Sequence, residues 1–330
     1  MNLLTMNYFF RHRQTDELYL EGNDLVGTIH TEIGSLVAIR DLFFGTNKLT
    51  GPIPSEIGKL TTLRALGLDE NFLTGTIPNL WTCTQLLIVY LDNNLLKGTI
   101  PAEIMSLKEL IDLRLRKNAF VGSIPESIQK LVHLELFYVD SNELTGTIPN
   151  VWNLMPRIQE IQVYKNKLVG TLPDTFSTLN DLRIVYADNN ALNGTLPSSY
   201  GLLNDLETFY VFNNQLKGKI PTEYGNIDNL RDVQMYNNKL TGHIPSEIGK
   251  NYKLLKLEVH ENALSGTIPT EFGQLESLQM LKLYRNKLTG SVPASVCTLK
   301  DKFDLSFLAT DCNIKGEGTL QCNCCNACYP

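Results

Sequence analysis

The sequence predicts an α/β fold: a right-handed solenoid with a parallel β-sheet on its concave face, short helical or 3-10 turns on its convex face, and a disulfide-stapled C-terminal cap. The stretch LQMLKLYRNKLTGSVP, Leu278–Pro293, recurs along the chain with a period of about 24 residues. Within it, leucines alternate with polar or aromatic residues, as in a strand that is buried on one face. Because one such unit cannot bury its own apolar side, neighbouring units must stack. Cysteines gather at the end of the chain.

An asparagine ends the strand of each repeat, in the pattern L-x-x-L-x-L-x-x-N-x-L-x-G-x-(I/V/L)-P. It occurs at Asn23, Asn47, Asn71, Asn94, Asn118, Asn142, Asn166, Asn190, Asn214, Asn238, Asn262 and Asn286. A side-chain amide that turns inward can bond backbone groups that would otherwise be buried without partners. We therefore interpret this column as a structural ladder.

The second half of each repeat contains a glycine and, in all repeats but the first, a closing proline. Glycine suits a tight turn or a close backbone approach, and proline suits the first position of a short helical turn. A glutamate often follows the proline by two places, where a helix N-terminus favours negative charge. These glutamates, Glu56, Glu103, Glu223, Glu247 and Glu271, are therefore expected at helix starts and not in a catalytic site.

A period in the twenties with this signature is typical of leucine-rich repeats. The L-x-G-x-I-P half resembles the plant-specific class of these repeats, which occurs in receptor-kinase ectodomains and polygalacturonase-inhibiting proteins. The resemblance covers about residues 15 to 296, in twelve consecutive copies. It implies a second sheet on one flank of the solenoid and a twist of the superhelix.

The composition is that of an ordered protein, with 330 residues, 43% of them hydrophobic, and a net charge of −6. No basic stripe is evident, so nucleic acid is not an expected partner. No run of about 18 apolar residues occurs, so no transmembrane segment is predicted in this chain. The unbroken repeat predicts one elongated domain, with a leader or partial cap at 1–14, twelve repeats at 15–296 and a Cys-rich cap at 297–330.

The first residues, MNLLTMNYFFRHRQ, are apolar but do not form a clear signal peptide, because no basic residue precedes the apolar run and no small-residue cleavage site follows it. Either this stretch covers the open end of the solenoid, or the chain begins inside a longer precursor, which we favour. Leu18, Leu20, Ile29 and Leu36 lack the usual cap. An exposed apolar edge promotes association, so homodimers through this end are expected.

Two further features concern single residues. The fourth repeat is one residue short and places Cys83 where the previous repeat has Leu60. We interpret Cys83 as a buried free thiol in a leucine position, with a reactive cysteine as the alternative. One glycosylation sequon, Asn193-Gly194-Thr195, lies in a loop that should be exposed.

The C-terminal stretch changes character. Phe303–Asp311 is expected to form a final strand, with Phe303 and Leu308 in core positions. Six cysteines in a short terminal segment indicate a disulfide-stapled cap in an oxidising compartment, and so a secretory, extracellular or endomembrane location. They are Cys297, Cys312, Cys322, Cys324, Cys325 and Cys328.

Fifteen disulfide pairings are possible, with the adjacent Cys324 and Cys325 expected to bond different partners. The rival interpretation is a metal knuckle of Cys322, Cys324 or Cys325, and Cys328, but this spacing is not that of a usual zinc site. We therefore predict no metal. The cysteine pattern of the last 35 or so residues resembles the ends of secreted leucine-rich repeat proteins of diatoms and related algae.

No catalytic constellation is present in the sequence. The five histidines are scattered, and neither H-E-x-x-H nor G-x-S-x-G occurs. The sequence therefore predicts a protein that is not an enzyme and needs no cofactor.

Two outward-pointing columns lie four and two residues before each ladder asparagine. Ten of these 24 positions are aromatic, whereas the 8% aromatic content of the chain gives about two by chance. Strand propensity and stacking between neighbouring strands are one explanation. A recognition surface is the other, and we favour it because the second column changes from aspartate to aromatic residues after the sixth repeat. Asp92, Arg116 and Asp140, in successive turns, are expected to form an exposed charge ladder.

The candidate ligand-binding residues on the concave face are Tyr138, Tyr164, Tyr186, Tyr210, Phe212, Tyr236 and Tyr284, flanked by Asp140, Asp188 and His260. The function predicted from them is non-catalytic recognition of a protein or peptide partner. Binding of cell-wall or matrix polysaccharide is the first alternative, and a structural or adhesive spacer is the second.

Overall fold

The computed structural model describes residues 16–312 and 320–329. Its internal contacts divide the chain into two compact units, Met1–Lys167 and Leu168–Pro330, and we describe each unit by itself. The predictions made for Met1–Gln14 lie outside the described residues.

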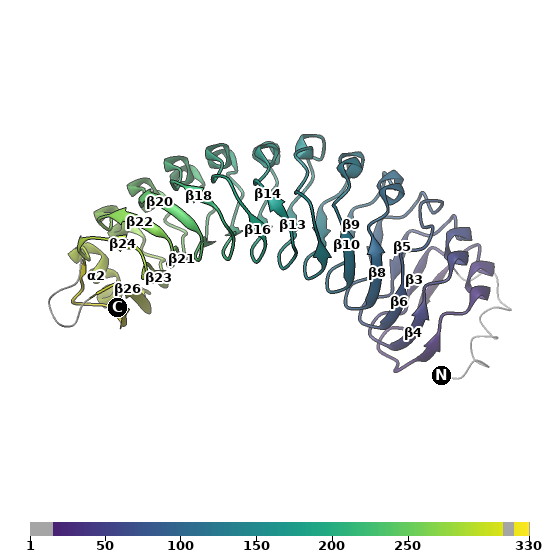
Figure 1. The fold of residues 1–330 in the computed structure, drawn as a ribbon. Coiled ribbons are helices and arrows are strands. Elements are labelled where there is room, and N and C mark those ends of the chain that lie inside the picture. Colours follow the sequence, from purple (N-terminus) through teal and green to yellow (C-terminus); the bar gives the residue numbers. More distant parts are fainter. Residues whose placement is uncertain (1–15, 313–319, 330) are drawn as a thin grey trace. The chain divides into compact units, whose positions relative to one another are not determined.

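Each repeat contributes a strand of three residues to a parallel main sheet, as the alternating leucines predict, and the cap adds β26 and β28 (Figure 1). In the first unit these strands are β1 (Glu17–Tyr19), β3 (Asp41–Phe43), β5 (Ala65–Gly67), β7 (Ile88–Tyr90), β9 (Asp112–Arg114), β11 (Leu136–Tyr138) and β13 (Glu160–Gln162). In the second unit they are β15 (Ile184–Tyr186), β17 (Thr208–Tyr210), β19 (Asp232–Gln234), β21 (Lys256–Glu258), β23 (Met280–Lys282), β26 (Phe307–Thr310) and β28 (Ala327–Cys328). Equivalent residues pair in register, such as Leu257 with Leu281.

The core lies behind the main sheet and is built from the same positions of every repeat. In β17, Phe209 is 1% exposed, whereas its neighbours Thr208 and Tyr210 are partly exposed. This alternation is the direct result of strand geometry, since successive side chains point to opposite faces. The outward residues of the strands form what we call the main-sheet face.

The predicted asparagine ladder is confirmed. Asn71 Oδ1 accepts the N–H of Leu49 at 2.9 Å, and its Nδ2 donates to the carbonyl of Phe44 at 3.0 Å. The same acceptor bond recurs at each ladder asparagine from Asn47 to Asn286. Asn23 is the exception: it is exposed and donates to the Glu21 carbonyl of its own turn.

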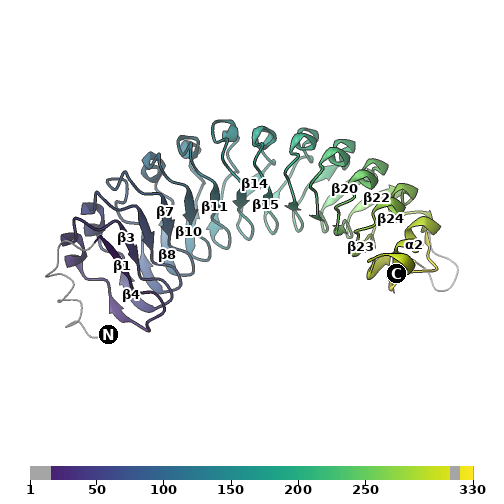
Figure 2. The ribbon, with the colours of Figure 1, turned by 180° about the vertical axis from the view of Figure 1, so that it is seen from behind.

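The second sheet implied by the plant-type resemblance is also present, and Figure 2 shows its strands β4, β8 and β10 beside the main sheet of the first unit. In that unit it has six strands: β2 (Val26–Thr28), β4 (Lys48–Pro52), β6 (Phe72–Gly75), β8 (Leu95–Thr99), β10 (Ala119–Gly122) and β12 (Glu143–Leu144). In the second unit it is broken into short groups: β14 (Val169–Gly170) with β16 (Ala191–Leu192); β18 (Lys217–Gly218), β20 (Lys239–His243), β22 (Ala263–Gly266) and β24 (Lys287–Leu288); and β25 (Gly290–Ser291) with β27 (Leu320–Gln321).

Short 3-10 turns lie on the side away from the main sheet (Figure 1). They are η1 (Thr31–Ser35), η2 (Ser55–Lys59), η3 (Ala102–Ser106), η4 (Glu126–Lys130), η5 (Trp152–Leu154), η6 (Asp174–Thr178), η7 (Ser198–Leu202), η8 (Thr222–Asn226), η9 (Ser246–Lys250) and η10 (Thr270–Gln274). The glutamates predicted at helix starts lie in the first turns of their helices.

The position expected for proline is wrong by one residue. Pro54 precedes η2 as its N-cap, with φ −63° and ψ 137°, and its carbonyl accepts the N–H of Ile57 at 3.2 Å. Pro54 thus has the extended ψ of an N-cap residue, while its carbonyl accepts the first i→i+3 hydrogen bond of the turn. The shortened fourth repeat has turns but no 3-10 helix between β6 and β7. Cys83 is there a buried free thiol, as predicted, 3.4 Å from the Ile57 carbonyl.

The C-terminal cap contains the nine-residue helix α2 (Ala294–Lys302) and three disulfides. Cys297 pairs with Cys324, Cys312 with Cys328, and Cys322 with Cys325, so the adjacent cysteines do bond different partners. The expectation that Phe303 is a core residue is wrong, since Phe303 is 41% exposed. Helix α2 runs through Lys302, so the chain re-enters the core only at Leu305, which is 2% exposed. Leu308 is buried as predicted.

Candidate functional site

A column of stacked rings runs along the main-sheet face of the second unit. Its members are Phe212, Tyr236, His260, Tyr284 and Tyr329, which we call the ring column. The three centroid distances from Phe212 to Tyr284 are each 4.4 Å, with interplanar angles of 9°, 11° and 25°. Tyr329 stacks on Tyr284 at 4.0 Å. The first four rings come from successive repeats, and each lies two residues after the end of its strand.

Tyr329 was not among the residues that the sequence singled out. It follows β28, which pairs with β26 inside the cap, and its N–H donates to the Thr310 carbonyl at 3.0 Å. The repeat pattern ends at Asn286, so periodicity gives no signal for a further strand. The only clue in the sequence is an aromatic residue directly after Cys328.

A second pair of rings belongs to the neighbouring column. Tyr186 stacks on Tyr210 at 4.7 Å, and Tyr210 lies 6.1 Å from Phe212, which connects it to the ring column. The Tyr210 hydroxyl donates to Asp232 Oδ2 at 2.8 Å. Burial, together with this carboxylate, raises the pKa of Tyr210, so its hydroxyl stays protonated at neutral pH.

His260 is the polar member of the ring column. It is 6% exposed, lies between two tyrosine rings, and its Nδ1 is buried with no hydrogen-bond partner among the described residues. Burial lowers the pKa of His260 to about 4. The imidazole is therefore neutral at pH 7 and behaves as an aromatic ring of the stack.

In the first unit the candidate residues lie in a charged network instead of a ring stack. The Tyr138 hydroxyl donates to Glu160 Oε2 at 2.5 Å, and the Arg114 guanidinium lies 5.3 Å from the Tyr138 ring. Arg114 also covers the Tyr90 ring at 4.3 Å and bonds Asp112 at 2.7 Å. Hydrogen bonds and cation–π contacts thus join the tyrosine rings to the charged side chains around them.

The expectation that these side chains protrude freely is wrong for several of them. Tyr138 is 8%, Asp140 0%, Asp188 4% and His260 6% exposed. The reason is the spacing of adjacent strands, about 4.8 Å, which lets side chains in one column cover each other. The structure places Tyr164 beside Asp140, to which its hydroxyl is hydrogen-bonded.

The two aspartates of the predicted exposed charge ladder are buried, whereas Arg116 between them is partly exposed. Arg116 bonds Asp92 at 3.4 Å, and Asp92 is 5% exposed. Asp140 accepts from the Ser141 hydroxyl at 3.1 Å, while its Oδ1 is buried without a partner among the described residues. Burial raises the pKa of both aspartates.

A second exposed face is formed by the six-stranded flank sheet of the first unit. The residues directly after the repeat glycines are Thr28, Pro52, Thr76, Thr99, Ser123 and Thr147. Those directly before them are Val26, Thr50, Thr74, Lys97, Val121 and Thr145. We call these twelve positions the flank rows. All are exposed, and only Lys97 is charged; Lys48 and Glu143, the first residues of β4 and β12, border the rows.

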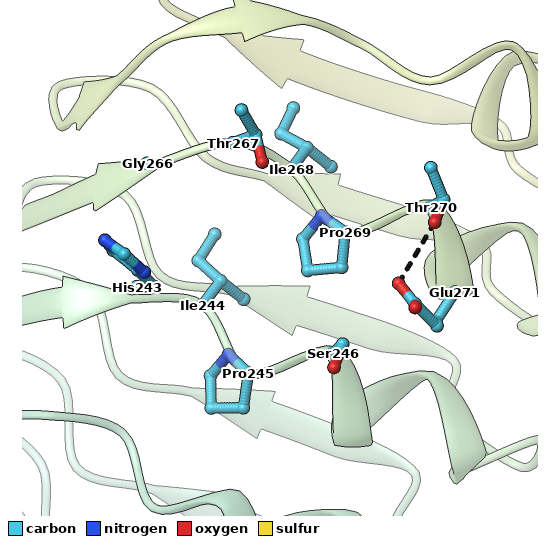
Figure 3. Close-up of a pocket in the computed structure, with 10 residues that line it drawn as sticks. All are labelled: His243, Ile244, Pro245, Ser246, Gly266, Thr267, Ile268, Pro269, Thr270 and Glu271. Atoms are coloured by element: carbon cyan, nitrogen blue, oxygen red, sulfur yellow. Dashed lines mark hydrogen bonds between the residues drawn. The ribbon is translucent and has the colours of Figure 1, made fainter.

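A shallow hollow lies in the second unit, where two repeats turn from β20 and β22 into η9 and η10 (Figure 3). Its floor is Ile244 and Ile268, its rim Pro245 and Pro269, and the Glu271 carboxylate bonds the Thr270 hydroxyl at its edge. The hollow repeats the ordinary turn geometry of the fold, so we assign no ligand to it. Among the described residues, no helix is long and apolar enough to cross a membrane.

A family profile described as Leucine Rich Repeat matches residues 229–251, and a search of curated proteins finds no match. Among solved structures, a TDR receptor matches with TM-score 0.87 and 28% identity, over 93% of this chain and 53% of that chain. The chain is a leucine-rich repeat protein.

This leucine-rich repeat protein is of the plant type. The Arabidopsis receptor kinase HAESA, solved in complex with the peptide hormone IDA and the co-receptor SERK1, matches with TM-score 0.84 and 32% identity, over 88% of this chain and 49% of that chain. The protein thus spans about half the length of these two receptor chains. A plant ice-binding protein matches with TM-score 0.64 and 25% identity, over 87% of this chain and 83% of that chain.

Proposed function

We propose that this leucine-rich repeat protein is a non-catalytic recognition module of the secretory pathway that binds a protein or peptide segment on the main-sheet face of its second unit. The ring column carries this proposal. It presents a rigid strip of aromatic edges that loses little conformational entropy when a ligand binds. The HAESA complex with a peptide hormone supports the choice of ligand. The three disulfides and the exposed sequon at Asn193 support the compartment.

The stacking geometry bears on the polysaccharide alternative. A sugar ring stacks on an aromatic face, but Tyr236, His260 and Tyr284 are each covered on both faces by neighbours at 4.0 to 4.4 Å. What they offer is ring edges, which carry the positive end of the ring quadrupole and suit carbonyl and carboxylate oxygens. An extended peptide supplies such oxygens at regular intervals along its backbone, so it fits this strip better than a stacked sugar does.

The test is selection from a library of displayed peptides on immobilised protein. Peptides that bind the natural protein are expected to lose affinity for a Tyr236→Ala/Tyr284→Ala variant. Removing a central aromatic anchor costs about 2–4 kcal/mol of binding energy. The matched control is Lys217→Ala/Lys239→Ala, two exposed flank positions of the same unit. Selected peptides that bind the tyrosine variant as tightly as the lysine variant would contradict the proposal. So would a protein that selects no peptide and binds only polysaccharides.

A second candidate function is binding to ice, favoured by the flank rows. About a quarter of the residues of a typical domain are charged, yet the twelve flank-row positions contain seven threonines and a single lysine. The similarity to a plant ice-binding protein over 83% of that chain supports this candidate. The test is thermal hysteresis and inhibition of ice recrystallisation by the whole purified chain, with bovine serum albumin as the control. Activity no greater than that of albumin would contradict it.

A further inference from the structure

We propose that ice, or the ordered water layer that joins ice, is held by the flank rows of the first unit, and not by the flank of the second unit or by the main-sheet face. This proposal rests on the second candidate function, ice binding, and names the surface that would bind the ice.

The first argument is that the threonines are held in fixed orientations by the glycines of the next repeat. A Cβ built on Gly98 would lie 2.9 Å from Thr76 Cγ2, and one on Gly122 would lie 3.0 Å from Thr99 Cγ2. The methyls of Thr28, Thr76 and Thr99 therefore rest on the bare backbone of the following glycine. With χ1 set by this contact, these three hydroxyls keep a constant place relative to their strands.

The second argument is that the two flank rows interlock into one surface. In register, Thr28 lies beside Thr50 on the next strand, Pro52 beside Thr74, and Thr99 beside Val121. The Thr50 hydroxyl is also held in place, because it donates to the Gly27 carbonyl at 3.2 Å. Hydroxyl and methyl groups thus recur from strand to strand at the spacing of a parallel sheet, about 4.8 Å.

The third argument concerns what such an array does to water. A hydroxyl is both a donor and an acceptor, so it can take a lattice position in a hydrogen-bonded water network. Bridging waters cost little when the groups that hold them are already rigid. Methyl groups between the hydroxyls leave the adjacent water no alternative polar partner. A lysine ammonium is strongly hydrated and imposes its own shell of water, so the scarcity of charge in these rows matters.

The flank of the second unit lacks this character. Its equivalent positions include Lys217, Lys219 and His243, and Asn193 of the sequon is also there. A glycan on Asn193 would cover the neighbouring threonines Thr171 and Thr195. The contrast between the two flanks supplies a matched experiment within one chain.

The experiment compares two double variants of the whole chain. Thr76→Lys/Thr99→Lys places two charges in the rows of the first unit, and Thr171→Lys/Thr267→Lys places the same two charges at equivalent positions of the second. Lysine is compatible with the fold there, because Lys219 already occupies the same repeat position with its side chain over Gly242. Thermal unfolding of both variants verifies that they fold.

The expected result is that the first variant loses most of the thermal hysteresis and ice-recrystallisation activity, while the second retains it. Replacing the one charge in the rows, by Lys97→Thr, should raise the activity above that of the natural chain. If the natural chain is active and both double variants keep its activity, the assignment of the surface is overturned while ice binding stands. If the natural chain is inactive, ice binding itself fails, and the assignment fails with it.

Discussion

The ring of Tyr329 stacks on the ring of Tyr284 with 4.0 Å between centroids, although Asp311 occupies the strand position between them. Asp311 leaves the column because its carboxylate accepts the backbone N–H groups of Arg285 and Asn286, the latter at 2.8 Å. It thereby replaces the two backbone carbonyls that a further repeat would have supplied, as those of Tyr284 and Arg285 do for Glu261 and Asn262. The cap thus satisfies the last turn and also extends the ring column by one ring.

The first prediction follows from this connection between cap and column. Tyr329 adjoins Cys328, whose disulfide to Cys312 ties the last strand to the sheet. Reducing the disulfides should release Tyr329 and loosen the C-terminal repeats first, since terminal repeats have one neighbour only. Hydrogen exchange under reductant should accelerate beyond Asn262 before it accelerates near Asn142. A Cys83→Ala variant serves as the control for thiol reactivity, and simultaneous loss of protection along the whole chain would refute the prediction.

The second prediction concerns pH. The pKa of His260 falls from 6.5 to about 4 on folding, mainly through burial, with Glu261, Lys282 and Arg285 acting as smaller influences. The unfolded chain therefore binds a proton in this range that the folded chain does not, and stability should decline as pH falls from about 6.5 to about 4. We expect this group to account for roughly 1–3 kcal/mol.

A His260→Phe variant keeps a ring in the column and removes the titration. Urea unfolding at pH 7 and pH 4.5 should show a smaller pH dependence for this variant than for the natural chain. The same pH dependence in both proteins would mean that His260 is not its source. Asp69 acts in the opposite direction, because burial raises its pKa to about 6 and the folded chain then binds the extra proton as pH falls.

The third prediction tests the asparagine ladder. Asn214 accepts the Leu192 N–H at 2.9 Å and donates to the Ala187 carbonyl at 3.0 Å. Asn214→Leu leaves these buried backbone groups unpaired and should cost about 1–3 kcal/mol in the free energy of unfolding. Asn23→Leu, at the exposed ladder position, should change it by less than about 0.5 kcal/mol. Equal losses in denaturant unfolding would mean that the ladder bonds are not the source of stability.

The fourth prediction concerns the glycine column. Gly98 has φ +85°, a backbone conformation that residues with a side chain rarely adopt. A Cβ at this position would also lie 2.9 Å from the Thr76 methyl. Gly98→Ala should destabilise the protein by about 1–3 kcal/mol. Adding Thr76→Ala should recover part of this loss, because it removes the methyl but leaves the backbone conformation unchanged. If the second change recovers nothing in thermal unfolding, the threonine does not rest on the glycine as described.

The sequence determined those features that arise from one repeat and its immediate neighbour. Strand alternation, the asparagine ladder, the buried Cys83 and the division of Cys324 and Cys325 between different disulfides were all predicted, because they depend on local spacing and on stacking at a constant period. The positions two and four residues before the asparagine lie on the face opposite the leucine core, as strand alternation predicts. Their role in binding a ligand stays a prediction.

Only the tertiary structure decided how those outward side chains pack against and cover one another. Tyr138 and Asp140 became buried, and His260 became a neutral ring in a stack, because covering a side chain depends on what stands 4.8 Å away on the next strand. Tyr329 entered the ring column, and Phe303 left the core, because helix α2 and the disulfides of the cap replaced the repeat there. A periodic pattern predicts the contacts that recur in every repeat. The contacts of the cap, at the end of the repeat array, occur once and join residues that are distant in the sequence.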